Sequence, residues 1–449
     1  MAENANRAEI TFLGGLGEVG RNCTAVEIGE KILVIDCGVM FPPKKMGGGG
    51  SPPSSSEQGF LLPNFAWLAE RKESIEGVVL THGHLDHIGG LPELVKTLGV
   101  TEEAPLEVSG TRFTLALALK RLLEFDLQKR VQFRVMGDRE IAEIGSFRVE
   151  TFPVSHSIPD ASGLLIRTPA GLLLHSGDFK LPTAPDGRAT DLGRLREVSG
   201  SVSLALVDST NALEGGVSGG EQTVEVVLDE LFAAATDRRI VVSTFSSNVH
   251  RVQTVVNLSR RWGRRVCLVG SSLRSTAEIA EILGFLHAPG AKGWLDTWRV
   301  DDEAPGGVTI ICTGAQGEES SALFRMSRGD AKMPTLGPSD TVVLSASTIP
   351  GNEGEVRSML THLRERGVKV VTSADHHVHV SGHACVDELR EFHEVLRSPH
   401  GRFVPVHGTE DMLRAHGAIA METGLSPDRL AVLKNGDSVV LSRRKSAGR

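Results

Sequence analysis

The stretch THGHLDHIGG, residues 81–90, decides the fold of this chain, because it places His82, His84, Asp86 and His87 within six positions. It follows the apolar run GVVL (77–80), which is typical of a buried strand, and Gly83 permits a sharp turn at the strand end. A single histidine here would more often be a surface or core residue. Four polar side chains buried in one turn would lack partners without an ion, so the stretch predicts a site for a borderline metal such as zinc or manganese.

The ends of other apolar runs supply further candidate ligands, which a site for two ions would need. They are His156 in FPVSHSIPD, Asp178 in LLLHSGDFK and His407 in FVPVHGTED, and each leads into a turn. Any one of them could equally be a capping or turn residue. Together with the first stretch they make a chemically sensible set of imidazole and carboxylate donors.

The composition describes a globular chain of more than one domain. Its 449 residues are too many for one ordinary core and predict roughly two to three domains. A hydrophobic share of 40% and a charged share of 23% argue against extensive disorder. No window has the apolar length of a membrane span, and the start MAENANRAEI lacks the apolar core of a signal peptide, so a cytoplasmic protein without a membrane partner is expected.

Cysteine content and charge exclude two further classes of protein. The five cysteines are scattered and form no C-x-x-C pair, which argues against both a disulfide framework and a thiolate zinc site. With 48 basic and 56 acidic residues, the net charge of -8 gives no global attraction to a polyanion. Nucleic-acid binding must therefore be local. The basic clusters RRWGRR (260–265) and SRRK (442–445) could contribute, or could be ordinary solvated helix ends and a tail.

The order of segments indicates two kinds of sheet. Strand-like runs such as KILVIDCG (31–38) alternate with helical ones such as RFTLALALKRLLEF (112–125), which is typical of an α/β sandwich. From about residue 210, longer units such as TVEVVLDELFAAATDRRIVVSTF (223–245) favour a doubly wound parallel sheet. After about residue 378 the short strand-like runs return, namely RFVPVHG (402–408), LAVLKNG (430–436) and SVVLS (438–442). The Gly/Ser/Pro-rich segment 42–59 is predicted to be a mobile loop.

Taken in order, these motifs resemble a known superfamily over almost the whole chain. DCG (36–38), HGHLDHIGG (82–90), SHSIPD (155–160) and SGDFK (176–180) match the metallo-β-lactamase fold. The continuation is similar to the β-CASP nucleases, and within them to the ribonuclease J family, in DSTNA (208–212), FSSNVHRVQ (245–253), CTGAQGE (312–318), IPGNE (349–353), HVSGHA (379–384) and PVHG (405–408). The resemblance implies an αββα sandwich formed by residues 1–209 and 379–449, with an inserted β-CASP α/β domain of parallel-sheet type over 210–378.

The same resemblance implies a role for each candidate residue. One divalent ion would be held by His82, His84 and His156, and the other by Asp86, His87 and His407, with Asp178 bridging the two. The ions would be zinc or manganese, with magnesium as a further option. Asp36 would orient histidine ligands, as carboxylates behind metal sites commonly do. Asp208 and His383 match the acidic and histidine motifs of the β-CASP nucleases.

Catalytic and phosphate-binding roles follow from the resemblance as well. Asp86 would orient the attacking hydroxide, and His383 would donate a hydrogen bond to the scissile phosphate. A solvent-exposed histidine is the alternative for His383. Residues for the 5′-monophosphate of the substrate would be Ser247, Asn248, Ser381 and Gly382. For Ser247, an N-cap of the helix that begins near VHRVQTVV is at least as good an interpretation.

The implied activity is that of a two-metal ribonuclease that acts on single-stranded RNA. It would remove nucleotides from the 5′ end, prefer a 5′-monophosphate and have some endonuclease activity, in rRNA processing and mRNA decay. A homodimer and an RNA-degradation complex are the implied assemblies. A DNA nuclease of the same fold is the alternative that metal ligands cannot separate. A small-molecule metallo-hydrolase does not explain the insertion, and a non-enzymatic RNA-binding scaffold does not explain the complete ligand set.

The sequence departs from the family pattern at three places. The chain stops soon after LKNGDSVVLSRRK, where the family usually has a further domain, so it is either a short form or a truncated one. The segment 42–59 replaces an expected hydrophobic stretch. Ser271 stands where the family tends to have arginine, which predicts the loss of one phosphate contact.

Overall fold

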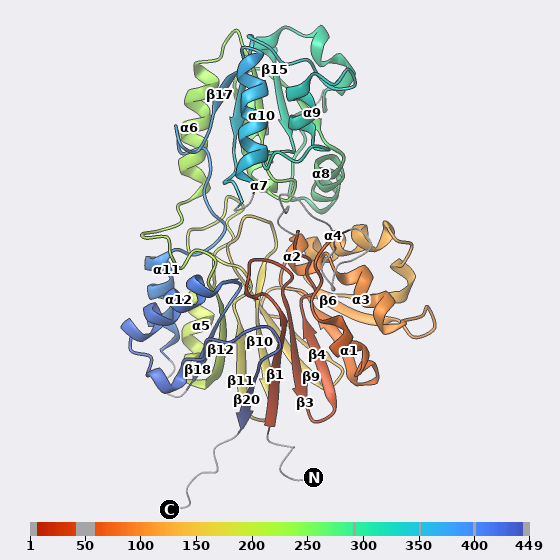
Figure 1. Cartoon of the computed structure of the whole chain (residues 1–449), viewed down its shortest axis with the longest axis vertical. Coiled ribbons are helices and arrows are strands. Elements are labelled where there is room, and N and C mark those ends of the chain that lie inside the picture. Colours follow the sequence, from red (N-terminus) through yellow and green to blue (C-terminus); the bar gives the residue numbers. More distant parts are fainter. Residues whose placement is uncertain (1–6, 42–58, 291–292, 350–351, 398–400, 443–449) are drawn as a thin grey trace, which may run out of the picture.

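Two β-sheets lie face to face, with helices on both outer faces, in the half of the molecule that carries the chain ends in Figure 1. The structure is a computed structural model, and it describes residues 7–41, 59–290, 293–349, 352–397 and 401–442. Apolar side chains of both sheets interdigitate between them, among them Phe12, Phe147 and Leu206. Because each strand points alternate residues inward, the two sheets share one buried layer.

The first sheet has seven strands and the second has six. In order, the first contains β20 (Ser438–Ser442), β1 (Arg7–Gly14), β3 (Cys23–Ile28), β4 (Lys31–Ile35), β5 (Ile75–Val79), β6 (Leu106–Gly110) and β7 (Val131–Val135). The second contains β18 (Arg402–Val406), β12 (Val202–Asp208), β11 (Gly171–His175), β10 (Ser162–Thr168), β9 (Phe147–Pro153) and β8 (Ile141–Ile144). A short parallel pair, β2 (Leu16–Gly17) and β19 (Gly408–Thr409), connects the segments around them.

Two groups of helices cover the outer faces of this sandwich, as Figure 1 shows. On the side of the first sheet lie α1 (Phe65–Ala69), α2 (Leu85–Ile88), α3 (Leu91–Leu98) and α4 (Arg112–Leu123). On the side of the second lie α5 (Leu192–Val198), α11 (Val386–Leu396) and α12 (Glu410–Glu422). The αββα arrangement expected from the sequence is therefore present.

A third sheet, which is entirely parallel, forms the other half of the molecule. Its strands, in order, are β14 (Arg265–Val269), β15 (Val308–Cys312), β13 (Arg239–Ser243), β16 (Asp340–Leu344) and β17 (Lys369–Val371). Its helices are α6 (Glu221–Ala233), α7 (Val249–Arg261), α8 (Ser271–Leu283), α9 (Ala322–Arg328) and α10 (Glu353–Glu365). The chain enters this part after β12 and leaves it before α11, which confirms an inserted parallel α/β unit; the exact boundaries 209/210 and 378/379 stay a prediction.

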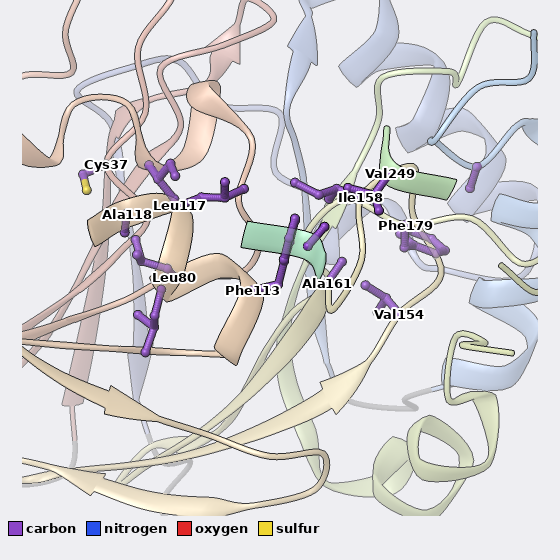
Figure 2. Packing of buried hydrophobic residues seen from close by; sticks show 14 of the residues in the cluster. Cys37, Leu80, Phe113, Leu117, Ala118, Val154, Ile158, Ala161, Phe179 and Val249 are labelled. Carbon is purple, nitrogen blue, oxygen red and sulfur yellow. The ribbon is translucent and has the colours of Figure 1, made fainter. Parts of the chain in front are cut away.

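One apolar core continues from the sandwich into the inserted unit. The largest cluster of buried residues includes Leu80 and Phe113 of the sandwich together with Val249 of α7, and Figure 2 shows part of it. Between α4 and α8, the ring of Phe113 meets Phe285 edge-on with 5.3 Å between the centroids. A shared core of this kind resists free hinge motion between the two parts, because separating them would expose apolar surface to water.

Two local segments, residues 430–436 and 42–59, were given a specific expectation from the sequence. The run LAVLKNG was predicted as a strand, and this is wrong: Leu430 makes one isolated bridge with Phe403, and no strand covers residues 431–436. The apolar side chains of this run pack against the core between the sheets instead, so burial rather than pairing explains the pattern. The predicted mobile loop at 42–59 lies outside the described residues, apart from Gly59.

The cysteines and the helices agree with the compositional analysis. All five cysteines are free and buried. Among the described residues, no helix has both the length and the apolar character that crossing a membrane requires.

A pair of histidines between α11 and α12, with His416 buried and His393 half-buried, makes stability depend on pH. His393 Nε2 lies 3.0 Å from His416 Nε2, and His416 Nδ1 lies 2.9 Å from Ser209 Oγ. Burial lowers the pKa of His393 from 6.5 to about 4 and also lowers that of His416. Between these two pKa values the unfolded chain therefore binds more protons than the folded chain. The stability that the neutral pair contributes is complete above pH 6.5 and is lost as the pH falls toward 4.

We therefore expect His393→Leu to flatten the acid side of the stability curve. Between about pH 7 and pH 5 the wild-type free energy of unfolding should fall more steeply than that of the variant, by roughly 1.4 kcal/mol per pH unit for one proton. Melting temperatures measured across this range on both proteins check it. Parallel curves would contradict the assignment of the proton uptake to this pair.

Candidate metal centre

The stretch 81–90 forms the turn that its glycine and histidines predict, with one addition. The strand β5 ends at Val79, and the fully buried His82 follows. Asp86 and His87 then lie on the single helical turn α2, which was not anticipated from the sequence. At a spacing of one residue along this turn, the two side chains can approach the same centre from adjacent directions, which a fully extended chain would not allow.

Seven predicted ligands converge around α2, which lies at the end of the sandwich nearest the inserted unit in Figure 1. They can be divided into two groups, and within each group the ligand atoms all lie within 4.8 Å of one another. The first group is His82, His84, His156 and Asp178, and the second is Asp86, His87, His407 and Asp178. A third group, formed by Asp178, Asp208, His383 and His407, overlaps the second, and Asp178 is common to all three. The division of the ligands between two ions stays a prediction.

Asp178 lies between the two groups. Its Oδ2 is 3.2 Å from His87 Nε2 and 3.5 Å from His82 Nε2, while its Oδ1 is 3.5 Å from His407 Nδ1. On the second group, His407 Nε2 is 3.2 Å from Asp86 Oδ2. Nitrogen and oxygen donors gathered around one carboxylate fit divalent ions of the zinc or manganese type, so the donor chemistry of the site agrees with a metal centre.

The electrostatics of the cluster favour the ligand form of most members. Burial lowers the pKa of His84 to about 4 and holds those of His82 and His156 well below their ordinary range, so these imidazoles stay neutral. Burial would raise the pKa of Asp178, but the adjacent His407 and His87 hold it below its usual value. His87 and His407, surrounded by carboxylates, have raised pKa values. Cation binding would displace their protons, which couples metal affinity to pH.

Asp36 lies behind the cluster and holds one of its histidines. Its Oδ2 is 2.8 Å from His87 Nδ1, and its carboxylate accepts hydrogen bonds from both the backbone N–H and the hydroxyl of Thr81, each at 2.8 Å. The backbone of Asp36 is left-handed, with φ of 58°. This strained conformation turns the carboxylate away from β4 and toward the metal ligands.

Asp208 and His383 form a pair beside the second group. His383 Nδ1 lies 2.8 Å from Asp208 Oδ2, and Asp208 Oδ1 lies 3.3 Å from His407 Nδ1. The side chain of Asp208 is 2% exposed and that of His383 is 20% exposed, so the imidazole is the part of the pair that reaches solvent. Burial lowers the pKa of His383, but the charge and hydrogen bond of Asp208, together with the charge of Asp178, raise it overall.

The four predicted phosphate-binding residues belong to two segments. Ser247 and Asn248 precede α7, and Ser381 and Gly382 directly precede His383. The alternative of Ser247 as the N-cap is wrong, because Asn248 is the cap and its side-chain oxygen accepts from the backbone N–H of Arg251 at 3.0 Å. Sequence alone could not separate two adjacent residues that both favour caps. The carbonyl of Gly382 lies 2.7 Å from His156 Nδ1, which connects this segment to the first group.

Other histidines and the basic cluster lie apart from the centre or have structural partners. His175 is buried, and its Nδ1 accepts from the backbone N–H of Gly177 at 3.0 Å, as expected for a satisfied core histidine. His376 and His377 are exposed, and His379 is half-buried. Within RRWGRR, Arg264 is buried and donates to backbone carbonyls, so much of this cluster serves the fold. SRRK lies outside the described residues, apart from Ser442.

Several residues that sequence reasoning missed complete the site. The amide of Asn22 donates to the carbonyl of Asp86 at 3.1 Å and lies 3.1 Å from His87 Nε2. The hydroxyl of Thr210 lies 2.7 Å from both Asp208 Oδ1 and His407 Nδ1. Thr210 lies within DSTNA and Asn22 directly precedes β3, but small polar side chains near turns are too common for these positions to identify them.

Gly38 lets the segment with Asp86 approach the end of β4. A Cβ at this position would lie 1.6 Å from the Asp86 carbonyl oxygen, which no real contact permits. We expect Gly38→Ala to displace α2, so that metal content per chain falls by more than half and cleavage slows by at least about tenfold. Elemental analysis of the purified variant checks this. Gly200→Ala, where a Cβ meets nothing within 4 Å, is the matched control and should behave as wild type.

Comparisons with known families agree with the geometry of the site. Residues 16–197 match the family model described as the metallo-beta-lactamase superfamily. Residues 237–363 match the ribonuclease J beta-CASP domain, and residues 356–428 match a Zn-dependent metallo-hydrolase RNA specificity domain. Fold, His/Asp clusters and these matches together support the binding of divalent metal ions.

Curated relatives resemble the chain over nearly its full length. It is 40% identical over 442 residues to ribonuclease J of Mycobacterium tuberculosis (strain H37Rv), covering 98% of this chain and 75% of that protein. It is 35% identical to ribonuclease J of Helicobacter pylori (strain 26695), covering 96% of this chain and 60% of that one. A crystal structure of a protein of unknown function from Enterococcus faecalis V583 has the same fold, with a TM-score of 0.66, 15% identity and coverage of 97% and 100% of the two chains.

Proposed function

This chain belongs to the ribonuclease J family and is a metal-dependent hydrolytic nuclease, and from that premise we propose that it is a 5′-to-3′ exoribonuclease that prefers a 5′-monophosphate. The observation that carries the proposal is the convergence of two His/Asp groups on Asp178, with the partly exposed His383 beside them. An additional endonuclease activity belongs to the proposal. The match to an RNA specificity domain favours single-stranded RNA over DNA as the substrate.

We assign one divalent ion to His82, His84, His156 and Asp178, and a second to Asp86, His87, His407 and Asp178. Zinc and manganese suit these donors, and magnesium is the harder alternative. When bound, the two ions supply Lewis acidity, which acidifies water and stabilises negative charge on an attacked phosphodiester. Asp36 keeps His87 in its ligand orientation through the hydrogen bond to Nδ1.

The chain's own residues position the reactants. Asp86, whose side chain is 30% exposed, orients the attacking water through its carboxylate. Because Asp208 occupies Nδ1 of His383, the Nε2–H of that imidazole donates a hydrogen bond to the scissile phosphate. Asp208 thereby acts as a catalytic partner of His383, fixing its tautomer and orientation.

A pocket for the terminal phosphate explains the direction of cleavage. Ser247 and Asn248 lie at the N-terminus of the 13-residue helix α7, where the helix dipole favours an anion. The hydroxyl of Ser381 accepts from Asn211 at 2.8 Å and from the backbone of His383 at 3.2 Å, so its hydrogen is available to a phosphate oxygen. At Gly382 a Cβ would lie 2.7 Å from His156 Cε1, so the glycine lets this segment approach the first group of ligands. A 5′-monophosphate anchored there places the first linkage at the metal centre.

A product ladder tests the proposal directly. End-labelled RNAs bearing a 5′-monophosphate, triphosphate or hydroxyl are incubated with the protein and manganese, magnesium or zinc, beside DNA of equal sequence. We expect mononucleotides from the monophosphorylated RNA and at least about tenfold slower release from the others, since a missing phosphate contact weakens transition-state binding. Equal rates on RNA and DNA would instead favour the DNA-nuclease alternative.

Localisation and assembly extend the same proposal. We place the protein in the cytoplasm, in rRNA processing and mRNA decay, as a homodimer and a component of an RNA-degradation complex. The family relationship supports these assignments.

A further inference from the structure

The two chain crossings between the sandwich and the inserted unit lie side by side. The first crossing, residues 213–220, leads from β12 to α6, and the second, residues 372–385, leads from β17 back to α11. They touch at Gly219, where a Cβ would lie 3.3 Å from Val380 Cγ1. His383 is carried by the second crossing, so its place at the metal centre depends on how this crossing is held.

Lys180 binds both crossings from the side of the metal centre. It lies two residues after Asp178 and is 1% exposed. Its Nζ donates to the carbonyl of Gly219 at 3.3 Å and to the carbonyl of Ser381 at 3.0 Å. A charged donor that is removed from water makes strong hydrogen bonds, and leaving those carbonyls without it would cost free energy.

Two buried carboxylates balance the buried cations around the crossings. Glu388 accepts from Ser218 N–H at 2.6 Å and from Cys385 N–H at 3.0 Å, so it also binds both crossings. The second carboxylate, Glu221, accepts through Oε2 from Arg251 Nε at 2.9 Å and from Arg251 Nη2 at 2.7 Å. Arg251 Nη1 in turn donates to the carbonyl of Val378, in the second crossing, at 2.8 Å. Burial lowers the pKa of Lys180, and the carboxylates of Glu221 and Glu388 offset this lowering only in part. We call Lys180, Glu221, Arg251 and Glu388 the crossing clamp.

Ser381 transmits the effect of the clamp to His383. The backbone N–H of His383 donates to Ser381 Oγ at 3.2 Å, and Asn211 binds both Ser381 Oγ and the carbonyl of His383. The segment 381–383 is therefore short, hydrogen-bonded and anchored at its first residue by Lys180. A shift of Ser381 would move the imidazole relative to Asp208 and Asp178.

We propose that Lys180 is a positioning residue that sets the His383 imidazole beside Asp208 by fastening the returning crossing at Ser381. The inference rests on the proposed function, in which His383 contacts the scissile phosphate. Lys180 itself touches neither substrate nor metal in this proposal. Its substitution should therefore slow the chemical step through His383 and raise KM by no more than about twofold, because Ser381 supplies only one of the proposed contacts to the 5′-phosphate.

A double-mutant cycle on the full chain with manganese tests this inference. Lys180→Met keeps the aliphatic stem and removes the donors. On 5′-monophosphorylated RNA it should lower kcat about tenfold with KM within about twofold, because a small misplacement of a catalytic group is costly. His383→Ala should lower kcat about a hundredfold. In the double variant, the lysine substitution should add no more than about twofold, since its effect acts through His383.

Hydrogen exchange gives a readout that does not depend on activity. Amides of residues 380–386 should exchange faster in Lys180→Met, while those of β13 should not change. The exposed Lys369→Met in β17 is the matched control and should alter neither exchange nor rate. If Lys180→Met fails to fold, as judged by its melting curve, Lys180→Gln replaces it. The amide of glutamine retains one donor group, so this substitution should cost less folding free energy than Lys180→Met.

Each outcome decides a separate point. Unchanged kcat in the lysine variant, or full additivity of the two substitutions, overturns the inference about Lys180. Near-normal cleavage by His383→Ala overturns the proposed role of His383, and the exchange of 380–386 then still decides whether Lys180 holds this segment. Faster exchange together with non-additive rates supports the inference.

Discussion

Asp178→Asn should abolish cleavage of 5′-monophosphorylated RNA, with a loss of about 10⁴-fold or more in kcat/KM. Its carboxylate is the one group shared by both His/Asp clusters, and Oδ2 lies within 3.5 Å of both His82 and His87. The amide has nearly the same shape but lacks the charge, and its NH2 group would face a cation. Metal analysis should therefore find one ion or none per chain.

The exposed Asp387→Asn is the matched control for this substitution, because Asp387 pairs with Arg390 on the surface of α11. It should leave both rate and metal content unchanged. Binding of single-stranded RNA by Asp178→Asn, measured by anisotropy, should persist, since phosphate contacts outside the centre remain. Turnover within about tenfold of wild type would rule out the two-ion assignment of Asp178.

His383→Ala should reduce kcat by about 10²- to 10³-fold while KM changes little. The imidazole is the exposed member of its pair with Asp208, and the raised pKa favours the form that donates to an anionic phosphate. Asp208→Asn should produce a similar loss, because the amide lacks the charge that favours a protonated imidazole and can present its NH2 group to Nδ1 in place of its oxygen. Metal content should stay near wild type in His383→Ala, which distinguishes this effect from that of Asp178.

Steady-state rates at several RNA concentrations separate the two contributions. A rise in KM with unchanged kcat would mean that His383 contributes ground-state binding instead, and would contradict the proposed donation in the transition state. His377→Ala is the matched control, since His377 is an exposed histidine of the same crossing.

The metal ligands could be predicted from sequence because each follows an apolar strand. In an α/β protein, strand ends meet at one edge, so His156, Asp178 and His407 could be expected near the stretch 81–90. The pairing of particular ligands came from the resemblance, and no spacing rule would have supplied it. The helical turn α2 escaped prediction, because four residues carry too little periodicity to identify a helix.

Residues that act through backbone contacts were beyond prediction. Lys180 looks like an ordinary charged residue after a motif, and only the fold places Gly219 and Ser381 within reach of its amine. The fully buried Arg251 is equally invisible, since its partner Glu221 is 30 positions away. The false strand at 430–436 has the opposite cause: its apolar residues are partly buried against the core, but the run makes only one bridge, between Leu430 and Phe403.

The distance along the chain between Asp86 and His407 has a consequence during protein synthesis. These ligands of one proposed ion are 321 positions apart, and the whole inserted sheet lies between them. A nascent chain on the ribosome therefore lacks one ligand of the second ion until the inserted unit has emerged and α11 has begun to pack. The second proposed ion can therefore gain its full set of ligands only after the whole inserted sheet has been synthesised.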